Sequence, residues 1–246
     1  MSPSVPAAPR FYVPFQLASG AEVELPERAA RHVAVLRLAR GDAITLFDGS
    51  GGQFAAEVTR VSRDSAHARI GRKDPIERES PLSVTLAQCV SAGDRMDLAV
   101  QKATELGVRR IVPLASERSI VRLSSERADR RLAHWRGIVT AACEQSGRNS
   151  VPEVLPITDL DAFLAQADAG ELRLVPSPDA DRRLKAFPPA RAVVLLVGPE
   201  GGLSAAERER ARAKGYAAVR FGPRVLRTET APLAVIAAMQ VLWGDC

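Results

Sequence analysis

The sequence predicts an α/β protein whose larger part is a mostly parallel sheet and whose smaller, N-terminal part is built from short strands. From residue 82 onward, short apolar runs alternate with stretches of helical period, as in a parallel sheet with helical crossovers. Before residue 72, strand-like segments surround one helical segment. The intervening residues 73–81 are polar and contain two prolines, which is typical of a linker. We therefore expect domains at residues 1–72 and 82–246.

The N-terminal domain is expected to close as a small barrel. Its expected strands are residues 11–15, 43–47, 55–61 and 66–70. Phe11, Val13 and Phe15 alternate with other residues, as the inward side of a half-buried strand does. Residues 48–52, Asp-Gly-Ser-Gly-Gly, are a strong hairpin signal between the second and third strands. A helix is expected from Pro26, and its expected apolar face consists of Ala30, Val33, Ala34 and Leu38.

The larger domain is expected to alternate strands with helices. Its expected strands are residues 82–90, 110–114, 172–175, 193–197 and 217–221. Asp94 is expected to cap a helix that ends at Gly107, because short acidic residues favour helix starts and glycine favours helix ends. Ser204 and Glu207 match a capping box for the helix between the last two strands. A long, arginine-rich helix is expected over residues 125–147.

The final helix, residues 231–243, is apolar nearly all round. Such a helix must be covered on both sides. One side can face the sheet, and we expect a second subunit on the other.

Composition narrows the function only weakly. The net charge of +5 and the pI near 9.5 suit a polyanionic partner. No apolar run approaches the length of a membrane span, and the first residues lack the charged and apolar regions of a secretory signal. The three cysteines and three histidines are scattered without the spacing of metal ligands. We therefore expect a cytoplasmic protein with reduced thiols, no membrane association and no metal site.

Two glycine-containing turns follow late strands of the expected sheet. Residues 198–202, Gly-Pro-Glu-Gly-Gly, come directly after strand 193–197, and a second turn begins at Gly222 after strand 217–221. Ligands of parallel α/β sheets bind at the carboxyl ends of strands, so these turns can form two walls of one pocket. An isolated glycine pair is more simply explained as a tight turn that closes a βα unit. The second turn favours the pocket.

The first turn is a poor site for a phosphate. It lacks the Lys-Ser/Thr of a Walker loop and the glycine spacing of a dinucleotide fold. A carboxylate such as that of Glu200, about 4 Å from a phosphate, would cost roughly 4 kcal/mol at a surface-like dielectric. A ligand that is apolar, hydrogen-bonding and cationic fits better. S-adenosyl-L-methionine is such a ligand.

Several motifs resemble those of one family. Residues 198–204 (Gly-Pro-Glu-Gly-Gly-Leu-Ser) and 226–231 (Leu-Arg-Thr-Glu-Thr-Ala) resemble the paired C-terminal motifs of the RsmE family, SPOUT-class methyltransferases that act on N3 of a uridine in 16S ribosomal RNA. Further matching segments are residues 32–37, 46–49, 93–97 (Gly-Asp-Arg-Met-Asp), 101–108, 116–119 (Ser-Glu-Arg-Ser) and 141–148. The resemblance therefore covers nearly the whole chain. One departure is Ala92, where the family commonly has a lysine or arginine.

The resemblance implies a SPOUT-type sheet with a C-terminal trefoil knot, which periodicity alone does not predict, and a PUA-like N-terminal β-barrel. It implies S-adenosyl-L-methionine as the cofactor and 16S ribosomal RNA, on the assembled small (30S) ribosomal subunit, as the substrate. It also implies a homodimer formed through the C-terminal helix. Two alternatives stay open: a methyltransferase of the same fold that acts on transfer RNA or on another ribosomal RNA position, and a non-catalytic RNA-binding assembly factor. The intact glycines and the intact residues 226–230 argue against the second.

Methyl transfer to uracil N3 needs a group that accepts the N3 proton and a cation that stabilises the forming anion. Arg227 is the candidate for the cation, and Glu229 is the candidate for the proton acceptor, with Glu200 as an alternative. Arg227 can equally form a salt bridge with Glu200 or Glu229, and each glutamate can instead cap a helix or pair with an arginine.

The remaining candidates bind cofactor or RNA. The expected cofactor-binding residues are Val175, Gly198, Pro199, Glu200, Gly201, Gly202, Phe221, Gly222, Leu226 and Thr230. Thr230 is also expected to cap the last helix. The expected RNA-binding residues are Arg10, Arg37, Arg95, Arg118, Arg122 and Arg148.

Overall fold

The computed structural model describes residues 8–119, 125–166 and 170–246. The chain divides into two compact units, Met1–Glu79 with Cys143–Val151, and Ser80–Ala142 with Pro152–Cys246. The first unit thus includes a short segment from far along the chain, which a division at residue 72 leaves out. Its last strand also runs to Asp74, two residues into the stretch expected as linker.

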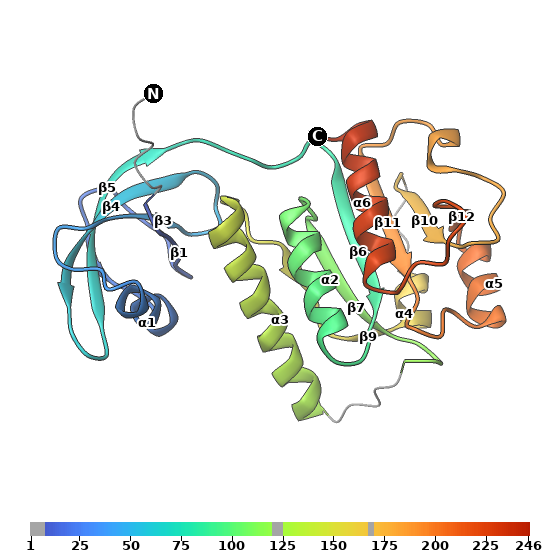
Figure 1. Ribbon diagram of the computed structural model, residues 1–246, viewed down its shortest axis with the longest axis horizontal. Helices are drawn as coiled ribbons and strands as arrows, with labels where there is room; N and C mark the ends of the chain where they lie inside the picture. The colour runs from blue at the N-terminus through green and yellow to red at the C-terminus, as the bar shows by residue number, and fades with distance from the viewer. Residues whose placement is uncertain (1–7, 120–124, 167–169) are drawn as a thin grey trace. The chain divides into compact units, whose positions relative to one another are not determined.

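The first unit is a mixed five-stranded sheet in the order β1-β3-β4-β5-β2 (Figure 1). Its strands are β1 (Arg10–Tyr12), β2 (Glu22–Glu24), β3 (Ala43–Phe47), β4 (Gln53–Val61) and β5 (Ala66–Asp74). β1 runs parallel to β3, and the other neighbours are antiparallel. The expected hairpin between β3 and β4 is confirmed.

The helix of this unit, α1 (Glu27–Val35), buries one face against the sheet. Ala30 and Val33 lie on that face as expected, but Ala34 is exposed, so its assignment to the face was wrong. The helix ends at Val35, and the chain reverses at Arg37 in the left-handed region (φ 55°). The amide of Leu38 then donates to the carbonyl of Val33 (3.0 Å), which returns Leu38 to the core.

The first strand is shorter than expected. Phe11 and Val13 are fully buried, which confirms the start of the alternation. Phe15 is 38% exposed, because β1 ends at Tyr12 and Phe15 lies in the bend that follows.

The second unit is a seven-stranded sheet in which every strand pair is parallel, in the order β12-β10-β11-β6-β7-β8 with β9 also on β7. Its strands are β6 (Ser83–Cys89), β7 (Arg110–Ala115), β8 (Glu153–Val154), β9 (Thr158–Asp159), β10 (Leu172–Pro176), β11 (Ala192–Val197) and β12 (Ala217–Val219). Its helices are α2 (Asp94–Glu105), α3 (Ser125–Ser146, whose last turn belongs to the first unit), α4 (Leu160–Ala165), α5 (Ala205–Ala213), α6 (Thr230–Trp243) and the 3-10 helix η1 (Leu184–Ala186). The predicted α/β class is confirmed.

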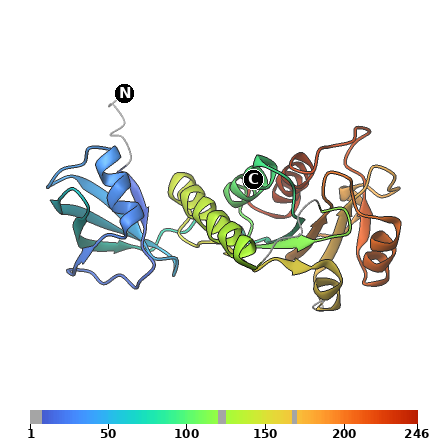
Figure 2. The same ribbon diagram turned by 90° about the horizontal axis from the view of Figure 1, so that it is seen from below.

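Helices cover both faces of this sheet. Along β11, Leu195 packs with a core that includes α2 and α6, whereas Leu196 packs with a core that includes α4 and α5. Figure 2 shows α2 and α6 (green and dark red) on one side of the sheet and α4 and α5 (gold and orange) on the other. A central strand such as β11 therefore packs against apolar side chains on both of its faces, which explains the continuous apolar runs in the sequence.

The helix ends of this unit differ in part from expectation. The capping box is confirmed: Ser204 Oγ accepts from the Glu207 amide (3.1 Å), and Glu207 Oε2 accepts from the Ser204 amide (2.7 Å). Asp94 is not the cap of α2, because Gly93, with φ 58°, takes the cap position and Asp94 becomes the first helical residue. Its carboxylate still lies in the first turn, where the helix dipole favours negative charge.

Thr230 is likewise the first residue of α6 and not its cap; the cap position is Glu229, without a side-chain capping bond. One side of α6 is buried through Val235, Ile236 and Met239. On the rest of the helix, Val241 is 66% and Leu242 40% exposed in the single chain. No helix in the described ranges is long and apolar enough to cross a membrane.

Candidate active site

A cavity of about 590 Å³ lies in the second unit, where β10 and β11 end. Three stretches line it: residues 175–179 at the end of β10, residues 197–203 at the end of β11, and residues 225–229 before α6 with Ala231 in its first turn. Arg95 of α2 and Arg208 of α5 complete the wall. The two turns singled out in the sequence therefore contribute two walls of one cavity.

Most residues expected to bind the cofactor lie in this wall. They are Val175, Gly198, Pro199, Glu200, Gly201, Gly202 and Leu226. Phe221 lines a smaller adjoining hollow of about 70 Å³, which shares Leu226 with the main cavity. Gly222 and Thr230 are not among the lining residues of either hollow. Both candidate catalytic residues, Arg227 and Glu229, line the main cavity.

The first turn requires glycine at two positions for different reasons. A Cβ atom on Gly198 would lie 2.8 Å from the backbone nitrogen of Leu203, so a side chain there would force the turn open. Gly202 has φ +65°, a conformation that L-residues with side chains rarely adopt. A Cβ atom on Gly201 would meet nothing closer than the side chain of Arg118 at 3.4 Å.

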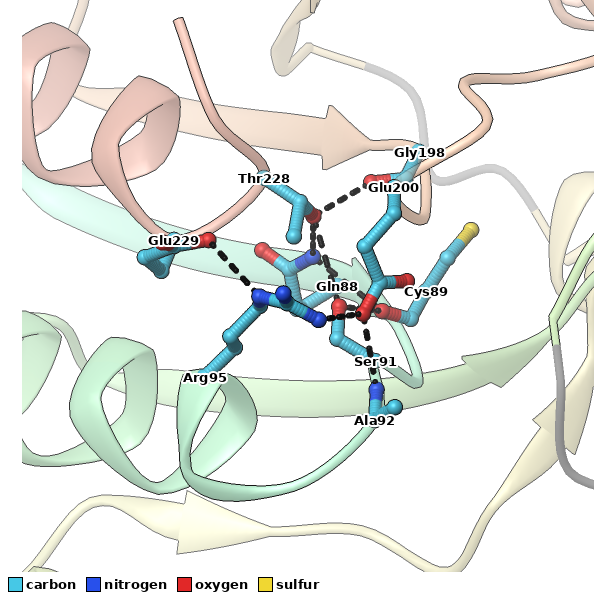
Figure 3. A network of polar contacts seen from close by, with 9 residues as sticks. All are labelled: Gln88, Cys89, Ser91, Ala92, Arg95, Gly198, Glu200, Thr228 and Glu229. Carbon is cyan, nitrogen blue, oxygen red and sulfur yellow. Dashed lines mark hydrogen bonds and ion pairs between the residues drawn. The ribbon is translucent and has the colours of Figure 1, made fainter.

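A buried hydroxyl joins the two walls (Figure 3). Thr228 Oγ1 donates to the carbonyl of Gly198 (2.7 Å) and accepts from Gln88 Nε2 at the end of β6 (3.1 Å). Ser91 Oγ lies 3.3 Å from the same oxygen. The sequence pattern included Thr228 in a motif but gave it no role, and nothing in the spacing separated it from Thr230.

An arginine from α2 forms the second link between the walls. Arg95 Nη1 donates to Glu200 Oε1 (2.9 Å), and Arg95 Nε lies 3.9 Å from Glu229 Oε2 (Figure 3). The alternative salt bridge of Arg227 with one of these glutamates is wrong, because Arg95 occupies that position. Arg227 is exposed at the cavity and has no side-chain hydrogen bond or ion pair within the described ranges.

The two glutamates differ in their surroundings. Burial alone would raise the pKa of Glu200, but hydrogen bonds from the Ala92 amide (2.9 Å), from its own amide and from Arg95 hold that pKa below its usual value. A carboxylate stabilised in this way is a weak proton acceptor. Glu229 Oε2 is buried and has no hydrogen-bond partner among the residues described, although Arg95 lies nearby. Glu229 Oε2 therefore lies beside a cation but accepts no hydrogen bond from the described residues.

The cysteine beneath the site is not a nucleophile. Burial raises the pKa of the Cys89 thiol to about 12. The thiolate is the reactive form, so Cys89 stays a neutral core side chain at neutral pH. No group of three His, Cys, Asp or Glu side chains in the described part of the chain is arranged to hold a metal ion.

Several arginines expected to contact RNA are engaged within the protein. Besides Arg95, Arg118 Nη1 donates to the carbonyl of Gly201 (2.7 Å), so it supports the first turn. In the first unit, Arg148 is 3% exposed and paired with Glu79. Arg10 donates to Asn149 Oδ1 (2.7 Å) and to Gln53, and its guanidinium lies over the Phe47 ring.

Two of the expected RNA contacts remain to be placed. Arg37 is exposed after α1, next to the exposed Val35 and Leu36. Arg122 lies outside the described residues.

Comparison with known families gives two matches. Residues 78–240 match the model of an RNA methyltransferase domain, and residues 25–71 match that of an RNA methyltransferase PUA domain. Among relatives, the ribosomal RNA small subunit methyltransferase E of Buchnera aphidicola subsp. Schizaphis graminum is 32% identical over 96% of this chain and 97% of its own. The protein of the same name from Bacillus subtilis is 30% identical over 87% of this chain and 88% of its own.

Solved structures agree with these matches. The Neisseria gonorrhoeae ribosomal RNA small subunit methyltransferase E, bound to S-adenosyl methionine, is 48% identical with a TM-score of 0.91, over 97% of this chain and 99% of that chain. A Legionella pneumophila protein described as a methyltransferase, in complex with the same cofactor, is 37% identical with a TM-score of 0.94, over the same shares. Because the RNA methyltransferase model spans most of the chain and the Buchnera relative exceeds 30% identity over nearly all of it, the chain belongs to the ribosomal RNA small subunit methyltransferase E (RsmE) family.

Proposed function

We propose that this protein transfers a methyl group from S-adenosyl-L-methionine to N3 of one uridine in the 16S RNA of the small ribosomal subunit. The observation that carries the proposal is the cavity at the ends of β10 and β11, whose walls are the two motifs that resemble the family. The relatives named above are small-subunit RNA methyltransferases, and one of them binds this cofactor.

The residues of the cavity fit the cofactor. Its volume of about 590 Å³ lies within the range of small-molecule sites. Val175 and Leu226 offer apolar walls for an adenosine, and the turn at Gly198 offers backbone groups. The carboxylates of Glu200 and Glu229 provide negative charge for a cationic sulfonium.

When bound, the cofactor supplies an electrophilic methyl group. The uracil N3–H bond must break as the N3–CH3 bond forms and the methyl–sulfur bond breaks. We assign the N3 proton to Glu229, because its buried Oε2 has no hydrogen-bond partner among the described residues. We assign Arg227 to the uracil carbonyl oxygen that gains negative charge, because Arg227 lines the cavity and its guanidinium has no partner among the residues that the structure describes. Arg95 holds Glu229 and keeps Glu200 ionised, so we regard it as a positioning residue.

The finer features of the function are part of the same proposal. We place the substrate on the assembled 30S subunit in the cytoplasm, with the PUA-like unit contacting the RNA. We also propose that two copies associate through α6, since its exposed Val241 and Leu242 continue an apolar helix. The C-terminal trefoil knot of the SPOUT class remains an expectation for this chain.

A transfer assay tests the function. The protein is incubated with cofactor labelled in the methyl group and with either 30S subunits lacking the modification, naked 16S RNA or total transfer RNA. We expect label in 30S subunits, at a uridine that yields 3-methyluridine on nuclease digestion. Label found only in transfer RNA would show that the substrate is a transfer RNA and not the 16S RNA. No label in any RNA, with intact cofactor binding, would favour a non-catalytic assembly factor.

A further inference from the structure

We propose that one rim of the cavity, residues 182–185 together with residues 220–227, binds the phosphates of the RNA strand beside the target nucleotide. We call this surface the arginine rim. The inference rests on the proposed function, because it states where that RNA lies on the second unit.

The two segments of the arginine rim lie side by side. The amide of Arg220 donates to the carbonyl of Arg182 (2.8 Å), and Arg183 lies opposite Arg220 in a parallel bridge. Each segment continues into the cavity wall, the first backward to residues 177–179 and the second onward to residues 225–229. A strand bound along the rim would therefore lead directly to the cavity.

Residues 182–185 (Arg-Arg-Leu-Lys) and 220–227 (Arg-Phe-Gly-Pro-Arg-Val-Leu-Arg) hold six cations and no acidic residue, although the exposed Asp181 directly precedes the first segment. Arg227 is the cation assigned above to the uracil, so five cations are left for phosphates. Arg183 and Arg220 are partners in the parallel bridge, so two of these cations start from neighbouring backbone positions.

Three of the rim cations are available to bind a phosphate, whereas Arg182 donates to the carbonyl of Ala186 (2.9 Å) and its guanidinium lies over the Phe187 ring. Arg183, Lys185 and Arg224 are exposed, and their side chains have no hydrogen bond or ion pair in the part of the chain that the structure describes. Other arginines around the cavity are already engaged: Arg95 with two glutamates, and Arg208 with the carbonyl of Leu203. Because a guanidinium can bind a phosphate through two parallel hydrogen bonds, unpaired arginines suit an RNA backbone.

A second copy of this chain is a poorer occupant of the rim. A two-fold contact would place the same surface on both partners and bring the six cations of each together. A polyanion meets no such repulsion. RNA is therefore the occupant that the charge favours.

The test compares two double variants of equal charge. The rim variant is R183Q/R224Q, which leaves Arg227 and the other residues of the main cavity in place; Arg224 lines only the smaller adjoining hollow. The control is R109Q/R191Q: both arginines are exposed and lack side-chain partners within the described residues. They directly precede β7 and β11, so they lie at the amino ends of the parallel strands, away from the edge that carries the cavity.

The measured quantity is the dissociation constant for unmodified 30S subunits, by filter binding, between about 50 and 200 mM salt. Each phosphate contact contributes about 0.7–0.9 to the slope of log K against log salt, so the rim variant should lose about 1.4–1.8 from that slope. At 0.1 M salt, this corresponds to a dissociation constant about 25- to 60-fold higher. The control should keep the wild-type slope, and both variants should keep the wild-type calorimetric affinity for S-adenosylmethionine.

Equal slopes for the rim variant and wild type would overturn the proposal, as would equal losses in the rim variant and the control. A change of sedimentation coefficient in the rim variant, without a change in slope, would instead assign the surface to a second copy. Failure of the wild type to methylate 30S subunits would refute the proposed function, whereas the arginine rim is judged by the binding slope.

Discussion

Replacing Arg95 tests how the site is held together. In R95Q, Glu200 keeps the Ala92 amide but loses its cation, and Glu229 loses the only charge near its buried oxygen that the described residues provide. At an effective dielectric of 20, unit charges at these two distances attract by about 6 and 4 kcal/mol. Arg95 is 44% exposed, so water and lost side-chain entropy remove most of that energy. We expect the free energy of unfolding to fall by about 1–2 kcal/mol.

The effect on catalysis should be larger than the effect on ligand binding. If Arg95 positions the proton acceptor, kcat should fall about 10- to 100-fold, which corresponds to about 1.4–2.7 kcal/mol in the barrier. Single-turnover transfer to 30S subunits at saturating cofactor measures this step, and calorimetry measures cofactor affinity separately. R95K keeps the charge but loses the planar fork, so it should recover part of the rate and most of the stability.

A different pattern would refute this reasoning. If Arg95 instead contacts RNA, as its motif suggested, R95Q should raise KM, lower the salt slope by about 1 and leave kcat unchanged. That result would return Arg95 to the RNA-binding residues and leave Glu229 without a positioning partner.

Three further outcomes are expected. Gly201→Val should fold normally, because only the Arg118 side chain lies near the new Cβ atom. The variant should nevertheless bind the cofactor about 1–3 kcal/mol more weakly in calorimetry, because the added side chain projects into the cavity wall. Unchanged affinity would contradict the placement of the ligand. Arg148→Met should lower the free energy of unfolding, measured by urea denaturation, by about 2–4 kcal/mol, because Glu79 is only 29% exposed and would lose its partner. A loss below about 0.5 kcal/mol would mean that water replaces the arginine. The depressed pKa of Glu200 gives stability that is present above its unfolded value near 4.5 and is lost as the pH falls through the lower folded value. The acid limb of Tm against pH should therefore be shallower in Glu200→Gln, and an unchanged limb would show that this carboxylate is not stabilised in the fold.

Much of the fold was readable from local pattern. Alternation identified Phe11 and Val13, helical period identified α2, a continuous apolar stretch identified α6, and the spacing of Ser204 and Glu207 identified a cap that the structure contains. These features depend on neighbours a few residues away. The two-residue strands β8 and β9 and the short helix α4 were not predicted, because elements so short carry no period.

The sequence predicted which residues lie in the site, but not the hydrogen bonds and ion pairs that join them. Glycines at a strand end identified the cavity, since backbone geometry is local. The partners of Glu200 could not be found in this way, because Arg95 lies more than a hundred residues earlier and any arginine in the chain was an equal candidate. Thr228 and Gln88 were missed for the same reason: their link spans β6 and the start of α6. The contrast between engaged and unpaired arginines is a property of the folded chain alone.

The segment Cys143–Val151 has a consequence for anyone who wants the N-terminal unit by itself. A fragment cut after Glu79 would discard Asn149, whose side-chain oxygen accepts a hydrogen bond from Arg10, and Arg148, which forms an ion pair with Glu79. It would also discard Glu144, whose carboxylate accepts the backbone amide of Tyr12. Excision at the apparent linker therefore removes internal scaffolding, and an isolated version of this unit has to carry residues 143–151 grafted back.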